Sequence, residues 1–224
     1  MIDLVILGAG GTAADVLDFI DEINRRRLTY RCVALLDDDP NKHDTHVSGM
    51  RVVGPLSRVR EWPHARVVDT LGSPASFRRR PERIGALVID HDRFETIVHP
   101  DAYLSPRCEI GPGSLVYPQV TICANVKLGT HVIILAHSVI NHDCSIGDYA
   151  IVASGVCLAG RVSIGRACYV GMASAVIQDT IVGDQALIGL GSVVIHDVLS
   201  GCVVAGNPAR PLRPTNTSAA ERPV

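Results

Sequence analysis

The sequence predicts two folded parts, an α/β, Rossmann-like domain over residues 1–95 and an all-β parallel β-helix over residues 96–213. Two patterns carry this prediction. Through the C-terminal part an aliphatic residue recurs at every sixth position, and the N-terminal part alternates strand-like and helix-like segments around glycine-rich turns. Residues 214–224 are expected to form a flexible tail.

The six-residue repeat starts at Val98 and continues to Val194 without interruption. All seventeen positions in this register carry Ile, Leu or Val, and the position four residues after each of them carries only Ala, Cys, Ser, Thr or Val. The large and the small position are thus two residues apart, as on one face of a strand. Each hexapeptide is therefore expected to contribute a short strand with these two side chains facing the core.

Glycine marks the length of one coil. An aliphatic residue followed by glycine recurs every 18 residues, at positions 110, 128, 146, 164 and 182. Three hexapeptides therefore form one coil, and residues 18 apart are expected to stack at about 4.8 Å. The glycines indicate tight backbone packing or bends. Cys108, Cys144 and Cys168 fall on the inward small position, which predicts buried thiols and no disulfides among them.

Composition excludes several classes of function. A net charge of -2 gives no electrostatic basis for binding nucleic acid or an anionic membrane. The N-terminus lacks a signal-peptide pattern, and no apolar run approaches the roughly 20 residues that span a bilayer. Seven cysteines without metal-type spacing favour a reduced protein, so a cytoplasmic location is expected.

The N-terminal part begins as a strand, a glycine-rich turn and a helix. Ile2 to Leu7 is strand-like, residues 8–11 read Gly-Ala-Gly-Gly, and a helix is predicted from Thr12 to about Arg26. Backbone N–H groups at such a turn can bind phosphate. Since Ala13 stands where the third glycine of GxGxxG would be, a tight turn without a ligand is the alternative.

Two further strands are predicted to end near this turn. Cys32 to Leu36 is followed by three aspartates, residues 37–39, and Val67 to Leu71 is followed by Gly72 and another helical stretch. An acidic residue at the end of the next strand suits ribose or sugar hydroxyls. Parallel α/β sheets bind ligands at this edge.

The segment Asn141-His142-Asp143-Cys144 holds the candidate catalytic residues. Because Cys144 faces inward, His142 and Asp143 are expected at an outward corner of the coil. Stacking by 18 puts Ala124 below His142 and Gly160 above it, which predicts an open shelf beside the imidazole. A histidine can act as general base, and a neighbouring carboxylate can set its tautomer. A solvated surface pair is the alternative.

His137 raises the possibility of a metal site, because γ-class carbonic anhydrases also use hexapeptide β-helices and hold zinc with three histidines. His137 and His142 are expected at different corners of one coil, and neither His99 nor His131 stacks on them. Catalytic zinc takes three protein ligands. No metal is therefore expected.

Together these features resemble the sugar O- and N-acetyltransferases, a family that includes the sialic acid O-acetyltransferases and the bacillosamine-pathway and perosamine N-acetyltransferases. The resemblance covers almost the whole chain. It is carried by Gly8-Ala9-Gly10-Gly11, Leu36-Asp37-Asp38-Asp39, Val53-Gly54-Pro55-Leu56, His99-Pro100, Asn141-His142-Asp143-Cys144, Ile146-Gly147 and Ala205-Gly206-Asn207-Pro208-Ala209-Arg210. It implies left-handed coils, a homotrimer and acetyl-CoA as co-substrate.

The resemblance also implies two sets of binding residues. The sugar nucleotide would be bound by Gly10, Gly11, Thr12, Asp37, Asp38 and Gly72. Acetyl-CoA, in the cleft between adjacent helices, would be bound by Ile151, Gly160, Gly171, Met172, Gly189 and Leu190. Family members often carry a histidine where this chain has Thr12, and some use a histidine toward CoA in the stretch that holds Ile151.

The leading hypothesis is N-acetylation of a nucleotide-linked amino sugar, with His142 as general base and Asp143 assisting. The alternatives are O-acetylation of sialic acid or another sugar, a metalloenzyme resembling the γ-class carbonic anhydrases, and a non-catalytic trimeric module that binds nucleotide sugars.

Overall fold

The computed structural model describes residues 1–214, which divide into two compact units. The first unit contains Met1–Leu71 and Glu82–Pro100, and the second contains Gly72–Pro81 and the chain from Asp101 onward. The segment Gly72–Pro81 thus belongs to the second unit although the first unit flanks it in sequence. Of the stretch expected to be a flexible tail, residues 215–224 lie outside the described residues, and Pro214 ends the last strand.

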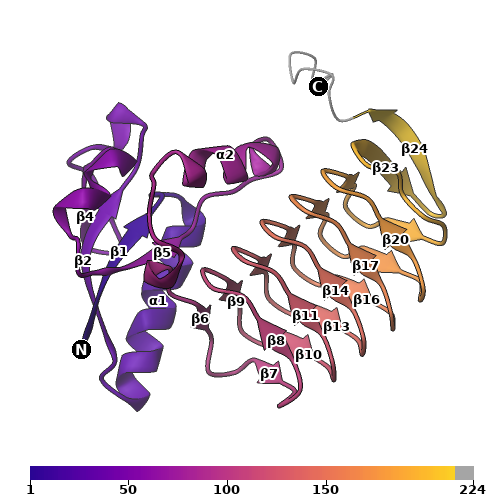
Figure 1. Ribbon diagram of the computed structural model, residues 1–224, viewed down its shortest axis with the longest axis horizontal. Helices are drawn as coiled ribbons and strands as arrows, with labels where there is room; N and C mark the ends of the chain where they lie inside the picture. Colours follow the sequence, from indigo (N-terminus) through magenta and orange to yellow (C-terminus); the bar gives the residue numbers. More distant parts are fainter. Residues whose placement is uncertain (215–224) are drawn as a thin grey trace. The chain divides into compact units, whose positions relative to one another are not determined.

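The first unit is built on a five-stranded sheet with the order β3-β4-β2-β1-β5 (Figure 1). Strands β1, β2, β4 and β5 run parallel, and β3 pairs antiparallel with β4. The elements up to the repeats are β1 (Ile2–Leu7), α1 (Gly11–Arg26), β2 (Tyr30–Leu36), β3 (His46–Val47), β4 (Met50–Gly54), β5 (Arg66–Asp69), α2 (Arg80–Gly85) and β6 (Ile97–Val98), with 3-10 turns at Pro40–Lys42, Leu56–Glu61, Phe77–Arg79 and His91–Arg93.

These elements agree with the predicted ones except for the hairpin β3–β4. The first strand has the predicted bounds, the helix starts one residue early, and β2 starts at Tyr30 instead of Cys32. Strand β5 covers Arg66–Asp69, so it ends two residues before the predicted end at Leu71. The hairpin was not predicted because its strands are short and only partly apolar. Its signal was the turn Ser48-Gly49, in which both residues have positive φ (45° and 81°), as in a two-residue type I′ turn.

The second unit is a left-handed parallel β-helix in which each hexapeptide forms a two-residue strand. Every strand from β6 to β22 ends on the aliphatic residue that the repeat predicted. The strands of this unit are β7 (Tyr103–Leu104), β8 (Glu109–Ile110), β9 (Leu115–Val116), β10 (Thr121–Ile122), β11 (Lys127–Leu128), β12 (Ile133–Ile134), β13 (Val139–Ile140), β14 (Ser145–Ile146), β15 (Ile151–Val152), β16 (Cys157–Leu158), β17 (Ser163–Ile164), β18 (Tyr169–Val170), β19 (Ala175–Val176), β20 (Ile181–Val182), β21 (Leu187–Ile188), β22 (Val193–Val194), β23 (Cys202–Gly206) and β24 (Ala209–Pro214).

Three parallel sheets form the sides of the β-helix, and each contains every third strand. One runs from β7 to β22, another from β8 to β20, and the third from β9 to β21 and on to the hairpin β23–β24 (Figure 1). Strand β13 pairs with β10 below it and with β16 above it, and the partners of Val139 are Thr121 and Cys157. The predicted stacking of residues 18 apart is thereby confirmed.

Both predicted inward positions are buried along most of the β-helix. Every aliphatic position from Val116 to Val194 and every small position from Ser114 to Val198 is buried. Leu104, Cys108 and Ile110 are half-buried, because within this unit the first coil has a neighbour on one side only.

Several small polar side chains fit the inward position because they donate a hydrogen bond to a main-chain carbonyl 15 residues later. Ser138 donates to Ala153 O at 2.9 Å, and Cys144 donates to Ala159 O at 3.1 Å. Burial raises the pKa of Cys144, and it raises the pKa of Cys168 to about 12. Both therefore remain neutral thiols, and all seven cysteines of the chain are free.

The glycine that follows the aliphatic residue is required where successive coils meet. A Cβ atom at Gly147 would lie 2.7 Å from the main chain of the next coil, at Gly165 C and Arg166 N. Backbone cannot move aside as a flexible side chain can. We therefore expect Gly147→Ala to destabilise the protein by about 3 kcal/mol, at the upper end of typical overpacking costs.

Urea unfolding followed by circular dichroism measures this effect. Gly85→Ala is the matched control, because a Cβ atom at the end of α2 would meet nothing within 4 Å. Equal unfolding midpoints for the two variants would contradict the close-contact explanation.

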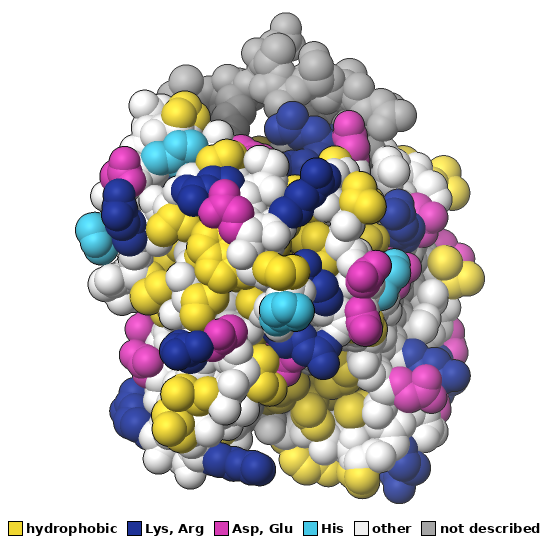
Figure 2. Space-filling view, turned by 60° about the vertical axis from the view of Figure 1, so that its left-hand side comes forward, with side chains coloured by type: hydrophobic (Ala, Val, Ile, Leu, Met, Phe, Trp, Pro, Cys, Tyr) yellow, Lys and Arg dark blue, Asp and Glu magenta, His cyan; other side chains and the backbone are white. Residues whose placement is uncertain are grey.

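The surface carries charges of both signs. Figure 2 shows Lys and Arg side chains interspersed with Asp and Glu on the face in view, as a net charge of -2 suggests. In the part of the chain that the structure describes, no helix has both the length and the apolar composition to cross a bilayer.

Candidate active site

His142 and Asp143 lie at a corner of the β-helix between β13 and β14, as the repeat predicted. Asp143 adopts a left-handed conformation, with φ 60°. Its N–H donates to Ala124 O at 3.0 Å, and the His142 carbonyl accepts from the N–H of Arg161, also at 3.0 Å. The coils below and above thus hold the main chain of this corner in place.

The side chains of His142 and Asp143 touch, which the sequence alone could not decide. His142 Nδ1 lies 2.8 Å from Asp143 Oδ2, and the two side chains are 54% and 45% exposed. The hydrogen bond from Asn125 and the one from His142 lower the pKa of Asp143. An ionised carboxylate only accepts hydrogen bonds. Nδ1 of a neutral imidazole therefore carries the proton, and Nε2 keeps a lone pair.

Asn125, on the coil below, completes this group. Its Nδ2 donates to Asp143 Oδ1 at 2.9 Å, so each oxygen of the Asp143 carboxylate has a partner. Sequence reasoning missed this residue, although its position 18 residues before Asp143 was the available signal.

Gly160 lies against the imidazole of His142. A Cβ atom at position 160 would lie 2.7 Å from His142 Cε1 and 2.8 Å from Nε2. The open shelf expected at this position is therefore occupied by the imidazole itself. The absence of a side chain at Gly160 is what admits the ring in this orientation.

The coil above carries an ion pair of its own at the same corner. Arg161 donates to both carboxylate oxygens of Asp179, at 2.6 and 2.9 Å. Arg161 is thus paired with Asp179, while Asp143 has hydrogen bonds to Asn125 and His142.

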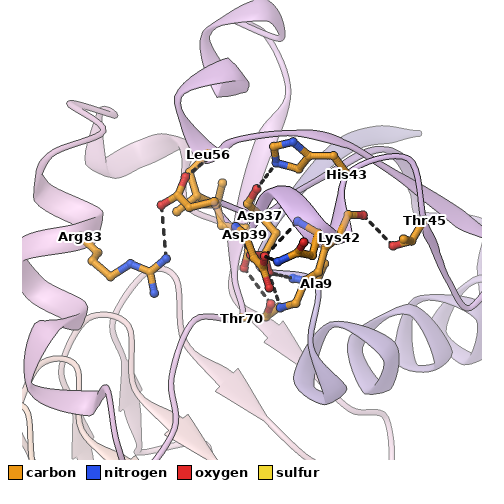
Figure 3. Close-up of polar contacts among 12 residues, drawn as sticks. Ala9, Asp37, Asp39, Lys42, His43, Thr45, Leu56, Thr70 and Arg83 are labelled. Atoms are coloured by element: carbon orange, nitrogen blue, oxygen red, sulfur yellow. Dashed lines mark hydrogen bonds and ion pairs between the residues drawn. The ribbon is translucent and has the colours of Figure 1, made fainter.

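In the first unit the ends of β1 and β2 meet through Asp37. This residue is only 8% exposed, and its carboxylate accepts from Ala9 N–H (2.8 Å), Asp39 N–H (2.9 Å) and Lys42 Nζ (2.9 Å) (Figure 3). Burial would raise the pKa of Asp37, but these hydrogen bonds together lower it. Both of its oxygens accept hydrogen bonds, and the one from Ala9 fixes the main chain of the glycine-rich turn.

The neighbouring predicted residues are more open. A Cβ atom at Gly10 or Gly11 would meet nothing within 4 Å. Thr12 lies half-buried in the first turn of α1. Asp38 is 52% exposed, accepts from Leu56 N–H at 3.0 Å and lies 3.3 Å from Arg83 (Figure 3). These four residues lie at the carboxyl ends of β1 and β2.

Gly72 and Ile151 lie together in the second unit. A Cβ atom at Gly72 would come within 2.7 Å of Ile151 Cδ1, and Ile151 is only 4% exposed. In the segment that starts at Gly72, the Arg80 side chain donates a hydrogen bond to Tyr149 O at 2.8 Å, and Phe77 packs beside Tyr169. The segment therefore covers the outer face of β15 and β18, and Ile151 does not lie on an open surface.

The other residues expected at acetyl-CoA differ in exposure. At Gly171 and Gly189 a Cβ atom would lie 2.6 Å from Ile188 O and 2.8 Å from Ala205 Cβ, respectively, so coil packing alone requires glycine there. Met172 and Leu190, which are 18 residues apart, are 57% and 82% exposed. They present a pair of apolar side chains to solvent.

Within residues 1–214, His137 and His142 do not come together as the ligands of one metal site. His137 occupies a different corner, with φ 61°. Among residues 1–214, neither His137 nor His142 belongs to a group of three side chains that could hold a metal ion.

Comparison with known proteins gives a family match over the segment that contains this corner. The profile of the family described as bacterial transferase hexapeptide (six repeats) matches residues 125–160, which include Asn125, His142, Asp143 and Gly160. Comparison with curated protein sequences gives no match.

Solved structures match nearly the whole chain. The acetyltransferase domain of PglB from Neisseria gonorrhoeae FA1090 is 29% identical with a TM-score of 0.82, covering 95% of this chain and 100% of that one. PerB from Caulobacter crescentus, solved with CoA and GDP-perosamine, is 28% identical with a TM-score of 0.82, covering 94% and 97%. WeeI from Acinetobacter baumannii AYE, at 20% identity and a TM-score of 0.60, covers 95% and 100% and shares the fold.

The hexapeptide repeats, the exposed histidine–aspartate corner and these full-length matches lead to one assignment. The chain is an acyltransferase, and over nearly its whole length it is similar to the acetyltransferase domain of PglB and to PerB.

Proposed function

We propose that this protein transfers the acetyl group of acetyl-CoA to the amine of an amino sugar carried on a nucleoside diphosphate. The observation that carries the proposal is the hydrogen bond between His142 Nδ1 and Asp143 Oδ2, which leaves Nε2 of an exposed imidazole as a proton acceptor. The similarity to PerB, solved with CoA and GDP-perosamine, supports the class of acceptor.

The proposed reaction is a general-base-catalysed acyl transfer. The amine attacks the thioester carbonyl while its proton passes to His142 Nε2, and a tetrahedral intermediate forms. Collapse of this intermediate breaks the carbon–sulfur bond, and the imidazolium returns the proton to the departing CoA thiolate. Asp143 stabilises the imidazolium between the two steps, as an ionised neighbour of a catalytic histidine does.

For the sugar nucleotide we propose contacts at the carboxyl ends of β1 and β2. Main-chain N–H groups at Gly10 and Gly11, with the positive end of the α1 dipole, suit a phosphate. The Thr12 hydroxyl and the exposed Asp38 carboxylate are hydrogen-bonding groups for the remainder of the ligand. Asp37 would act indirectly, because its hydrogen bond to Ala9 fixes the main chain of the turn.

For acetyl-CoA we propose a place beside the exposed pair Met172 and Leu190. The similar domain of PglB has been solved in complex with acetyl coenzyme A, and two stacked apolar side chains suit the pantetheine chain of CoA. We further propose that the protein works in the cytoplasm as a homotrimer, in which the cleft between neighbouring β-helices would hold this co-substrate.

Paired acceptors test the proposed reaction. UDP-, GDP- and dTDP-linked amino sugars are first screened by thermal shift, since ligand binding raises apparent stability. The sugar that binds and its hydroxyl counterpart are then assayed with acetyl-CoA. We expect acetylation of the amine. Turnover of the hydroxyl compound alone would indicate an O-acetyltransferase, and sugar-nucleotide binding without acetyl-CoA binding would indicate a non-catalytic module.

A further inference from the structure

Asn125 occupies the corner one coil below Asp143. It lies between β10 and β11, has a left-handed main chain with φ 60°, and is exposed. Its Nδ2 lies 2.9 Å from Asp143 Oδ1, while Oδ2 of the same carboxylate lies 2.8 Å from His142 Nδ1. The amide and the imidazole thus hold the carboxylate from opposite oxygens.

We infer that Asn125 is a positioning residue for catalysis, which orients the Asp143 carboxylate so that His142 keeps its proton on Nδ1 and presents Nε2 to the acceptor. This inference rests on the proposed acetyl transfer at His142. Asp143 is 45% exposed, and an exposed carboxylate can rotate about its side-chain bonds. The amide on the coil below opposes this rotation.

The chemistry of an amide suits this role better than that of a cation. A lysine or arginine at position 125 would neutralise Asp143 and weaken its attraction for the imidazolium. A neutral donor fixes the orientation and leaves the full negative charge facing His142. The charged groups around Asp143 are His142 itself and Arg161, and Arg161 is engaged by Asp179 at 2.6 and 2.9 Å.

Asn125→Gly tests the inference, because glycine tolerates the left-handed main chain while removing the amide. In ¹⁵N NMR spectra of the neutral imidazole, wild-type His142 is expected in the Nδ1–H form. In Asn125→Gly the population is expected to shift toward the Nε2–H form. An unchanged tautomer in Asn125→Gly would overturn the inference. This readout needs no acceptor, so it decides the role of Asn125 even if the proposed reaction fails.

The second readout is turnover with the amino-sugar acceptor. We expect kcat of Asn125→Gly to fall about tenfold, a fraction of the full general-base contribution, with KM for acetyl-CoA unchanged. Gln119→Gly is the matched control, since Gln119 is an exposed amide at an equivalent left-handed corner. Equal kcat values for the two variants would overturn the inference, whereas inactive wild-type protein would overturn only the proposed function.

Asn125→Asp is the second variant if Asn125→Gly does not fold, because Asp143 and Asp179 show that this corner accepts aspartate. A second carboxylate repels Asp143 and adds negative charge near the imidazole. We expect the acid limb of the kcat profile to move to higher pH, since extra negative charge favours the inactive imidazolium. A profile identical to wild type would overturn the inference.

Discussion

His142→Ala is expected to lower kcat by about 10²- to 10⁴-fold, the usual contribution of a general base. Without the imidazole, the proton of the attacking amine must pass to water. Asp143 cannot replace the base, because one of its oxygens accepts from Asn125 and hydrogen bonding lowers its pKa. Steady-state assays with saturating acetyl-CoA and the acceptor found by the thermal-shift screen measure the effect.

The fold of His142→Ala should be unchanged, because the side chain is 54% exposed and the coil is held by main-chain hydrogen bonds. Circular dichroism and the affinity for acetyl-CoA are the controls. A kcat within about tenfold of wild type would show that His142 is not the general base and that another group accepts the proton.

Gly160→Ala is expected to lower kcat by roughly 10²-fold, the scale of a misplacement by about 1 Å at a reacting group. The new methyl group would lie 2.7–2.8 Å from His142 Cε1 and Nε2, which is closer than such atoms can approach. Because the imidazole is a flexible side chain, it swings away and takes Nε2 with it. The same assay measures this effect.

Comparison with Gly147→Ala separates this loss of activity from loss of stability. At Gly147 the added methyl group meets main chain of the next coil, whereas at Gly160 it meets a side chain. Gly160→Ala should therefore unfold at nearly the urea concentration of the wild type while Gly147→Ala unfolds earlier. Wild-type turnover by Gly160→Ala would refute the packing of His142 described above.

The β-helix could be predicted almost completely from sequence because its contacts are nearly one-dimensional. Each residue contacts the residues 18 positions before and after it on the neighbouring coils, so the period of the sequence directly gives the contacts between coils. The first helix and strands of the N-terminal unit followed from the apolar pattern as well. The hairpin β3–β4 did not, since its strands are too short to show a period.

The site residues were predicted less completely than the fold, because a site depends on which atoms are already hydrogen-bonded or covered. Asp37 follows a strand as a ligand-binding carboxylate would, yet Lys42 and two main-chain N–H groups engage both of its oxygens. Ile151 holds an outward position, yet the segment from Gly72 covers it. The segment that covers Ile151 is distant in sequence, whereas Asp37 is engaged by Ala9, 28 residues away, and by its near neighbours Asp39 and Lys42.

The sequence by itself determined the two-part architecture, the coil of 18 residues and the corner that His142 and Asp143 occupy with Gly160 above them. Alternation along a strand and a constant coil length are enough for these conclusions. Only the tertiary structure decided that the imidazole and the carboxylate touch, that the ring fills the space beside Gly160, and that Asn125 holds the second carboxylate oxygen. Those contacts depend on side-chain directions at left-handed corners, which the spacing of residues leaves open.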